Sequence, residues 1–354
     1  MNAPPATPYL VLDEQILRDN IARTAERARA AGVALRPHVK THKCVEIARL
    51  QLEAGAVGIT VATVSEAEVF AAAGCDDIFI AYPLWVDAAK GERLRGLAQQ
   101  CRLRVGVDSS AGARQLAEAV AGSPIDVVVE VDSGHHRSGV RPQEAGAVAR
   151  AATDAGLRCV GVFTFPGHSY ALDGGRARAA ADEAAALTRA AASLREAGVE
   201  PQVVSGGSTP SLEFTDTGVA TEVRPGVYVV GDAQQWELGS ARPAEIALTA
   251  HATVVSHAGG RVVLDSGSKI LGADRAGYAT GFGRLLDHPD ARIVILSEHH
   301  GVVDLAGAAL PELGSIVRVV PNHVCNAVNL VDELVVGDPA RAVTWAVAAR
   351  GRNS

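Results

Sequence analysis

Eight short runs of mostly apolar, β-branched residues alternate with longer segments of helical periodicity over the first two thirds of the chain. Most of the runs are continuously apolar rather than alternating, which is typical of strands buried on both faces. Parallel strands with helices between them, over about 220 residues, predict a (β/α)8 barrel. A doubly wound open sheet is the alternative, because strand number alone does not show closure. The runs are Val33–Val39, Gly58–Thr63, Asp77–Tyr82, Leu103–Asp108, Ile125–Asp132, Cys159–Phe165, Gln202–Ser205 and Val223–Val230.

The sequence changes character near Pro243, where helical periodicity nearly disappears. Closely spaced strand-like runs joined by Gly, Pro and Asp turns predict an antiparallel β domain. The extended run Tyr9–Asp13 precedes the first helical segment, and we assign it to the same domain. We therefore expect a barrel at residues 14–238 and a β domain made of residues 1–13 and 239–354. Its expected strands are Glu245–Val255, Arg261–Asp265, Arg292–Leu296, Ser315–Val320, Glu333–Val336 and Ala342–Ala348.

Composition excludes several classes of protein. The 33 basic and 40 acidic residues of the 354-residue chain give a net charge of −7, which argues against nucleic-acid and anionic-membrane binding. No apolar run reaches the roughly 18 residues of a membrane helix. Five scattered cysteines without a CxxC motif favour a reducing compartment over a disulfide scaffold. Because the first 13 residues lack the pattern of a signal peptide, we expect a cytoplasmic protein.

Polar residues follow the ends of the predicted barrel strands, where barrel enzymes place their catalytic groups. The first strand leads into Arg36-Pro-His-Val-Lys-Thr-His-Lys43, a basic cluster that suits an anionic ligand. A solvated basic loop is an equally good interpretation of this segment. The seventh strand ends in Gly206-Gly-Ser-Thr209, a turn that can offer backbone amides and hydroxyl groups to a phosphate. A merely flexible turn is the alternative there.

A His-x-Cys pair, His323 and Cys325, stands in the predicted β domain. Residues i and i+2 of a strand point to the same face, so an imidazole and a thiolate would lie side by side. This donor pair suits Zn²⁺ or a similar divalent ion, and two protein ligands leave positions open for water or substrate. The alternative is one buried cysteine beside one hydrogen-bonded histidine.

Several separate stretches together resemble one family. Pro-His-Val-Lys-Thr-His-Lys, the later Asp-Ser-Gly-x-x-Arg-x-Gly, the Gly-Gly-Ser-Thr turn and the late Asn-His-Val-Cys occur in that order between Pro8 and Gly351. The chain is thereby similar to the D-serine dehydratase/D-threonine aldolase group of fold-type III pyridoxal 5'-phosphate (PLP) enzymes. That resemblance implies an alanine-racemase-like barrel followed by a C-terminal β domain.

The resemblance also implies roles for particular residues. Lys40 resembles the lysine that forms the Schiff base with PLP, and Lys43 is the neighbouring candidate. Catalytic positions on this pattern are Lys40, with His168 and Tyr170 on the loop bordering the cofactor ring and the substrate. The expected cofactor-binding residues are Lys40, Arg137, Tyr170, Gly207, Ser208, Thr209 and Tyr228, and the expected metal ligands are His323 and Cys325.

The implied activity is a metal-assisted lyase reaction on a D-3-hydroxy amino acid. Cysteine at the second metal position is the dehydratase-like choice, since many family aldolases carry Asp there. We therefore expect a D-serine dehydratase type of reaction, with D-threonine aldolase cleavage as the nearest alternative. An amino-acid racemase and a non-catalytic PLP carrier are more distant alternatives. Zinc is the expected metal, with manganese or cobalt as alternatives, and relatives of this kind suggest a homodimer.

Overall fold

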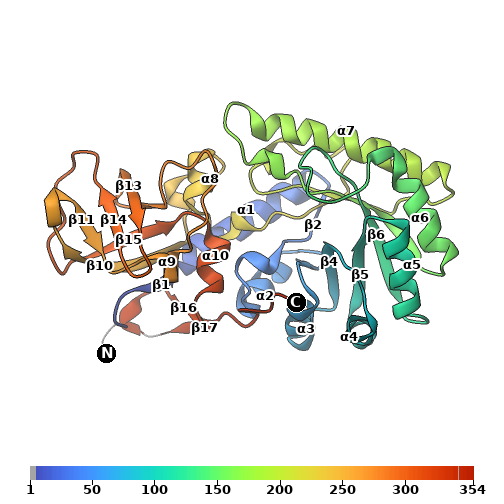
Figure 1. Cartoon of the computed structure of the whole chain (residues 1–354), viewed down its shortest axis with the longest axis horizontal. Helices are drawn as coiled ribbons and strands as arrows, with labels where there is room; N and C mark the ends of the chain where they lie inside the picture. The colour runs from blue at the N-terminus through green and yellow to red at the C-terminus, as the bar shows by residue number, and fades with distance from the viewer. Residues whose placement is uncertain (1–4, 342) are drawn as a thin grey trace. The chain divides into compact units, whose positions relative to one another are not determined.

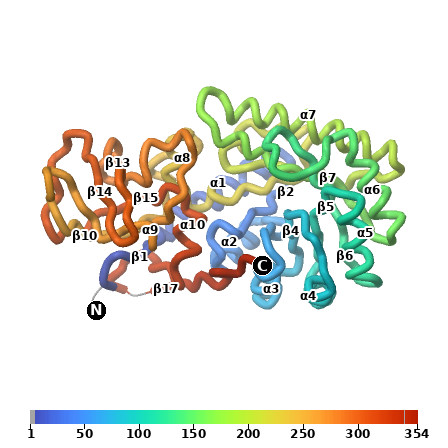
Figure 2. The backbone as a smooth tube through the Cα atoms, viewed as in Figure 1, coloured from blue at the N-terminus to red at the C-terminus, as the bar shows by residue number. Residues whose placement is uncertain are grey.

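The computed structural model describes residues 5–341 and 343–354 (Figures 1 and 2). Its contacts divide the chain into two compact units. We call residues 25–40, 51–226 and 352–354 the barrel unit, and residues 5–24, 41–50, 227–341 and 343–351 the β-unit. The domain limits expected from the sequence stay a prediction.

The barrel unit contains an eight-stranded sheet in which all neighbours are parallel, in the order β2-β9-β8-β7-β6-β5-β4-β3. A single parallel bridge between His38 and Thr60 joins the β2 end of the sheet to β3. This arrangement confirms the predicted alanine-racemase-like barrel. The strands are β2 (Ala34–Leu35), β3 (Ile59–Val61), β4 (Asp77–Pro83), β5 (Arg102–Val107), β6 (Ile125–Glu130), β7 (Arg158–Phe163), β8 (Val203–Gly206) and β9 (Glu222–Val223).

Helices follow these strands and lie outside the sheet, as Figure 1 shows for α3 to α7. Local capping explains where several of them begin: the Thr63, Asp87 and Ser109 side chains accept hydrogen bonds from backbone amides three residues later. The long helix α7 is followed by Gly198 at φ 83°, a left-handed conformation that ends helices. The helices are α1 (Glu14–Ala30), α2 (Val45–Glu53), α3 (Val64–Ala72), α4 (Ala88–Ala98), α5 (Ser110–Ala119), α6 (Ala145–Asp154) and α7 (Gly175–Glu196).

The eighth predicted strand is much shorter than expected. Only Glu222–Val223 pairs as a strand, and Val227–Val229 forms a turn of 3-10 helix. The intervening Pro225 lacks the amide that a strand ladder needs, and Gly226 weakens the extended conformation, so the run breaks there.

The β-unit contains a nine-stranded sheet whose strands β10, β11, β14, β13, β12 and β15 form a closed ring. Strand β1 (Tyr9–Leu12) pairs with β10, as expected for the Tyr9–Asp13 run, and also with β16. The other elements are β10 (Leu248–Ser256), β11 (Val262–Leu264), β12 (Gly283–Leu285), β13 (His288–Leu296), β14 (Gly301–Asp304), β15 (Ile316–Pro321), β16 (Glu333–Val336), β17 (Thr344–Ala346), α8 (Ala233–Glu237), α9 (Ser268–Leu271) and α10 (Val324–Asn329).

Two strands of this ring, β12 and β14, were not predicted from the sequence. They are three and four residues long and each includes a glycine, so they lack the alternation that marks a strand. Their neighbours in the ring supply the hydrogen bonds that hold them extended. The predicted strand Ala342–Ala348 forms as β17 over Thr344–Ala346, and Ala342 lies outside the described residues.

Two further features bear on chemistry. Cys44, Cys75, Cys101 and Cys159 are buried, whereas Cys325 is half-buried. Within the described residues, no helix combines the length and the apolar character that crossing a bilayer requires.

A buried ion-pair network links Arg36, the residue after β2, with side chains of β4, β5 and β9. Arg36, 1% exposed, donates from Nε to Glu222 at 2.7 Å and from Nη1 to Asp77 at 2.6 Å. Arg104 on β5 lies 3.4 Å from the same Glu222 carboxylate. Burial opposes ionisation of Glu222, but the Arg36 charge holds its pKa below the usual range. Each charge in the network thus depends on its partner for compensation.

Replacing Arg36 by Met should destabilise the protein strongly, because two buried carboxylates would lose their nearest counter-ion, with Arg104 left at 3.4 Å or more from each. We expect a loss of about 3–5 kcal/mol in the free energy of unfolding, measured by urea denaturation. The control Arg18→Ala, which removes an exposed pair with Glu14, should change it by less than about 1 kcal/mol. Similar losses in the two variants would contradict the role given to the network.

Candidate active site

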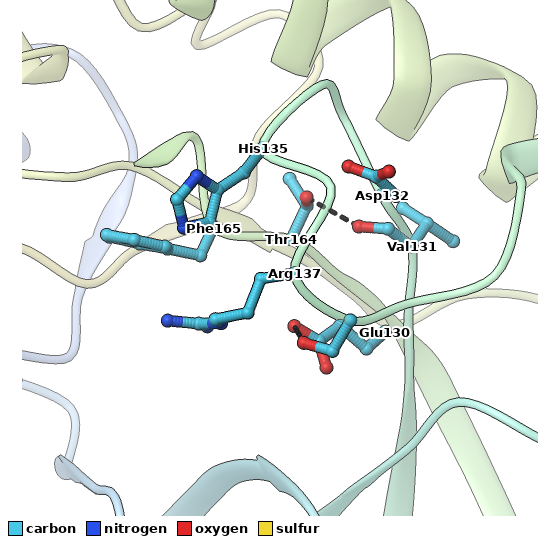
Figure 3. Close-up of a pocket in the computed structure, with 8 residues that line it drawn as sticks. Glu130, Val131, Asp132, His135, Arg137, Thr164 and Phe165 are labelled. Carbon is cyan, nitrogen blue, oxygen red and sulfur yellow. Dashed lines mark hydrogen bonds between the residues drawn. The ribbon is translucent and has the colours of Figure 1, made fainter. Parts of the chain in front are cut away.

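Lys40 lies in the one-turn 3-10 helix Val39–Thr41 that follows β2. Its Nζ is 5.9 Å from the centre of the Phe165 ring, and Arg137 Cζ is 5.1 Å from the same ring. The His135 ring meets Phe165 edge to face at 5.5 Å. Figure 3 shows Phe165 between the His135 ring and the Arg137 side chain. The structure therefore gathers Lys40 and Arg137, two residues expected to bind the cofactor, around one aromatic ring.

His38 lies among cationic groups. Its pKa is well below the ordinary value because of burial and because Lys40, Arg224 and Arg137 repel a further positive charge. The buried Nδ1 atom of His38 has no hydrogen-bond partner among the described residues. The imidazole is therefore neutral, and the positive charges of Lys40, Arg224 and Arg137 around it suit an anionic ligand.

A small pocket lies beside Arg137, at the ends of β6 and β7 (Figure 3). Ser138 donates to Glu130 at 3.0 Å, and Thr164 Oγ1 donates to the carbonyl oxygen of Val131 at 2.6 Å. These bonds hold the β6 loop against β7 next to the Arg137 side chain. The pocket residues are Glu130, Val131, Asp132, His135, Arg137, Ser138, Thr164 and Phe165.

The loop that carries His168 and Tyr170 interlocks with the loop after β6. A side chain at Gly134 would lie 3.2 Å from the His168 ring, and one at Gly167 would lie 2.5 Å from the His135 ring. Each loop thus uses a glycine to admit the histidine of the other. His168 Nε2 also lies 3.3 Å from an Asp182 oxygen. This packing fixes the backbone before Tyr170, which is half-buried.

The Gly206–Thr209 turn differs from the sequence prediction, in which its backbone amides were available to a phosphate. Two of these amides donate to side chains of the protein instead. The Gly207 amide donates to Glu183 at 2.7 Å, and the Ser208 amide donates to Ser211 Oγ at 3.1 Å. The Ser208 hydroxyl group is itself hydrogen-bonded to Ser169 Oγ and Ser211 Oγ, and the expected part of Ser208 and Thr209 in phosphate binding stays a prediction. Ser208 and Thr209 are 3% and 9% exposed.

His323 and Cys325 do not lie on a strand, which corrects the sequence prediction. Strand β15 ends at Pro321, His323 is the residue before helix α10, and Cys325 lies in the first turn of that helix. Their side chains nevertheless hydrogen-bond to each other. Cys325 Sγ also lies 3.4 Å from Thr41 Oγ1.

Negative groups surround the His323 ring. The Asp274 carboxylate hydrogen-bonds to Nδ1 of His323, and the fully buried Asp232 accepts the Val324 amide at 3.2 Å. Burial opposes protonation, but Cys325, Asp274 and Asp232 together raise the pKa of His323. A histidine and a thiol in such a field suit a divalent cation. Among the described residues, no group of three or more His, Cys, Asp or Glu side chains could hold a metal ion.

Two other candidates from the sequence lie in the β-unit. The Lys43 amine donates to Asn329 at 2.8 Å and is engaged there. Tyr228 is half-buried in the Val227–Val229 turn. Its expected part in phosphate binding stays a prediction.

Three acidic residues of these sites were not singled out from the sequence: Glu183, Asp232 and Asp274. Glu183 is 24 residues from Gly207, and Asp274 is 49 residues from His323. No local pattern indicates contacts at such separations. Asp232 does carry a weak signal, because it caps helix α8 by accepting the Gln235 amide.

The residues present fit PLP. The amine of Lys40 could bind its aldehyde, the positive surroundings of His38 match its anionic charge, and a turn with buried hydroxyl groups could accept its phosphate. His323 and Cys325 fit a divalent ion held by two protein ligands.

Comparisons with known proteins agree with this arrangement. The family model "Alanine racemase, N-terminal domain" matches residues 12–234, and a serine dehydratase domain model matches residues 247–337. The chain is 38% identical to D-threo-3-hydroxyaspartate dehydratase of Delftia sp. (strain HT23), covering 90% of each chain. It is also 38% identical to D-threonine aldolase of Arthrobacter sp., covering 98% of this chain and 93% of the other.

Solved structures of the dehydratase superpose closely. A Cys→Ala variant of D-threo-3-hydroxyaspartate dehydratase in the metal-free form has a TM-score of 0.88 at 34% identity and covers 97% of both chains. A His→Ala variant of the same enzyme, substituted two residues earlier, has a TM-score of 0.89 at 34% identity and covers 98% of this chain and 96% of the other. The protein therefore belongs to the D-serine dehydratase/D-threonine aldolase family of fold-type III PLP-dependent lyases.

Proposed function

We propose that this PLP-dependent lyase is a divalent-metal-assisted ammonia-lyase of the D-serine dehydratase type, acting on D-3-hydroxy amino acids. The observation that carries the proposal is the His323–Cys325 pair with Asp274 bonded to the imidazole. The same His-x-Cys spacing separates the two substituted positions in the dehydratase variants. Cys325 also contacts Thr41, which directly follows Lys40 in the sequence.

The chain's own residues supply binding and proton transfer. Bound PLP withdraws electrons from the α-carbon of the amino acid. The Lys40 amine would accept the proton from that carbon as the general base. Arg137, which lies beside Phe165, would hold the ring hydroxyl of the cofactor, and Ser208 and Thr209 would bind its phosphate. His323 and Cys325 would hold the divalent ion, and that ion would polarise the 3-hydroxyl group of the substrate.

The proposed reaction converts a D-3-hydroxy amino acid into a 2-keto acid and ammonia. The α-proton goes to Lys40, and the 3-hydroxyl group takes up one proton and leaves as water. One water molecule then hydrolyses the product enamine, through its imine, to the keto acid and ammonia, so that no net water is gained or lost. D-Serine would give pyruvate, and D-threo-3-hydroxyaspartate would give oxaloacetate. The second candidate is retro-aldol cleavage, which the equal identity to D-threonine aldolase favours. In that reaction the 3-hydroxyl group loses its proton, and the Cα–Cβ bond breaks to give glycine and an aldehyde.

A product assay separates the two reactions. With D-serine and D-threo-3-hydroxyaspartate we expect a keto acid and ammonia in equal amounts, detected by coupled reduction of the keto acid and by ammonia assay. With D-threonine we expect 2-oxobutyrate and ammonia, without glycine. Glycine and acetaldehyde as the main products would replace the dehydratase proposal by the aldolase.

Lys40→Ala should abolish both turnover and the visible absorbance of the bound cofactor, because no amine remains to bind the aldehyde. Lys43→Ala is the matched control, since that amine is engaged by Asn329. It should keep the absorbance. Absorbance spectra of the purified variants test this prediction. An unchanged spectrum for Lys40→Ala would show that another residue binds the cofactor aldehyde.

Asp274→Asn should weaken metal binding about 10–100-fold, because a ligand's hydrogen-bonded partner fixes its ring orientation and raises its basicity. Metal retention against a chelator measures this loss. Asp304→Asn, at an exposed aspartate that accepts the Ala306 amide in the same unit, is the control and should bind metal normally.

Removing the metal with a chelator should stop turnover, while the absorbance of the bound cofactor remains. Full activity of metal-free enzyme would contradict the role of His323 and Cys325.

A further inference from the structure

A buried carboxyl group lies directly against the Gly206–Thr209 turn. Glu183 on α7 is 2% exposed, and its Oε1 accepts the Gly207 amide at 2.7 Å. A side chain at Gly206 would begin 2.3 Å from the same Oε1 atom. Gly206 and Gly207 thus both lie against Glu183, and any side chain at position 206 would clash with its carboxyl group.

The conformation of the turn depends on this contact. Gly207 has φ 79°, in the left-handed region, and its amide points to the Glu183 carboxyl group. Ser208 and Thr209 follow directly. The Ser208 hydroxyl group is held by Ser169 Oγ at 2.9 Å and Ser211 Oγ at 2.8 Å. Glu183 therefore fixes the backbone immediately before the two hydroxyl-bearing residues.

The charge on Glu183 also matters to an anion at the turn. Burial raises the pKa of Glu183 to about 7, while the Gly207 amide and the Arg224 guanidinium partly oppose that rise. Arg224 is the charged group that acts on Glu183 from another element. A neutral carboxyl group can accept the amide without repelling a nearby phosphate, whereas an ionised one would repel it.

We infer that Glu183 is a positioning residue for the cofactor phosphate: it holds the Gly207 amide so that Ser208 and Thr209 present their hydroxyl groups to that phosphate. The inference rests on the proposed function, because it takes this turn as the phosphate site of PLP. Glu183 acts through the turn and has no contact with the substrate in this assignment. Its effect should therefore appear in cofactor binding.

The test compares PLP with pyridoxal, which lacks the phosphate. Full-length enzyme freed of cofactor is titrated with each compound, and binding is followed by absorbance. Glu183→Leu removes the acceptor for a buried amide and should reduce the preference for PLP over pyridoxal about tenfold. Glu183→Gln keeps an acceptor oxygen and should retain most of that preference. Pyridoxal affinity should stay the same in both variants.

The pH dependence provides a second readout. Glu183 ionises as the pH rises through about 7, so wild-type affinity for PLP should fall relative to Glu183→Gln between pH 6 and pH 8. Ionisations of the cofactor itself affect both proteins equally and cancel in this ratio. Pyridoxal should show no such difference, because it carries no phosphate for Glu183 to repel.

Ser193→Ala is the matched control on the same helix. Ser193 Oγ accepts the Gly146 amide at 3.0 Å, so this variant also removes an α7 acceptor from a glycine amide, but away from the turn. It should leave the PLP preference unchanged. An unchanged preference in Glu183→Leu, or identical pH profiles for wild type and Glu183→Gln if the leucine variant fails to fold, would overturn the inference. A wild-type protein without preference for PLP would instead overturn the assignment of the turn itself.

Discussion

The parallel sheet of the barrel unit closes where Thr60 of β3 donates its amide to Pro37 at 2.8 Å. On the other side His38 donates its amide to Pro225, just after β9, at 3.0 Å. The segment is therefore fixed from both sides two residues before Lys40. All eight strands run in one direction, so the loops after β6, β7 and β8 reach the same end of the barrel as Lys40.

The barrel unit contains two groups of charged side chains with different surroundings. In the Arg36 network each cation is matched by buried carboxylates, and the charges serve stability. Around His38 the charges of Lys40, Arg137 and Arg224 act together on a neutral imidazole. Glu222 and Glu130 compensate Arg224 in part, and an anionic cofactor near Lys40 and Arg137 would add to that compensation.

Much of the fold was predictable because most of its barrel strands are rich in β-branched apolar residues that are buried on both faces, as in Ile125–Glu130, where all residues are buried and Val127, Val128 and Val129 form the centre. The short strands β12 and β14 were not, since their neighbours in the ring determine them. The pairing of His323 with Cys325 was predicted, but on a strand instead of a helix start. The roles of Glu183 and Asp274 could not be predicted, because only tertiary contacts bring them to Gly207 and His323. The homodimer and the cytoplasmic location stay predictions.

The distribution of the cysteines has a consequence for redox chemistry. Burial raises the pKa of Cys44 to about 12 and those of Cys101 and Cys159 to about 11, so these thiols hardly form the reactive thiolate. Cys325 is the half-buried thiol and lies among polar groups. Peroxide or an alkylating reagent would therefore modify the sulfur assigned to the metal before it reached the sulfurs packed in the core. Such a modification would remove one of the two proposed metal ligands.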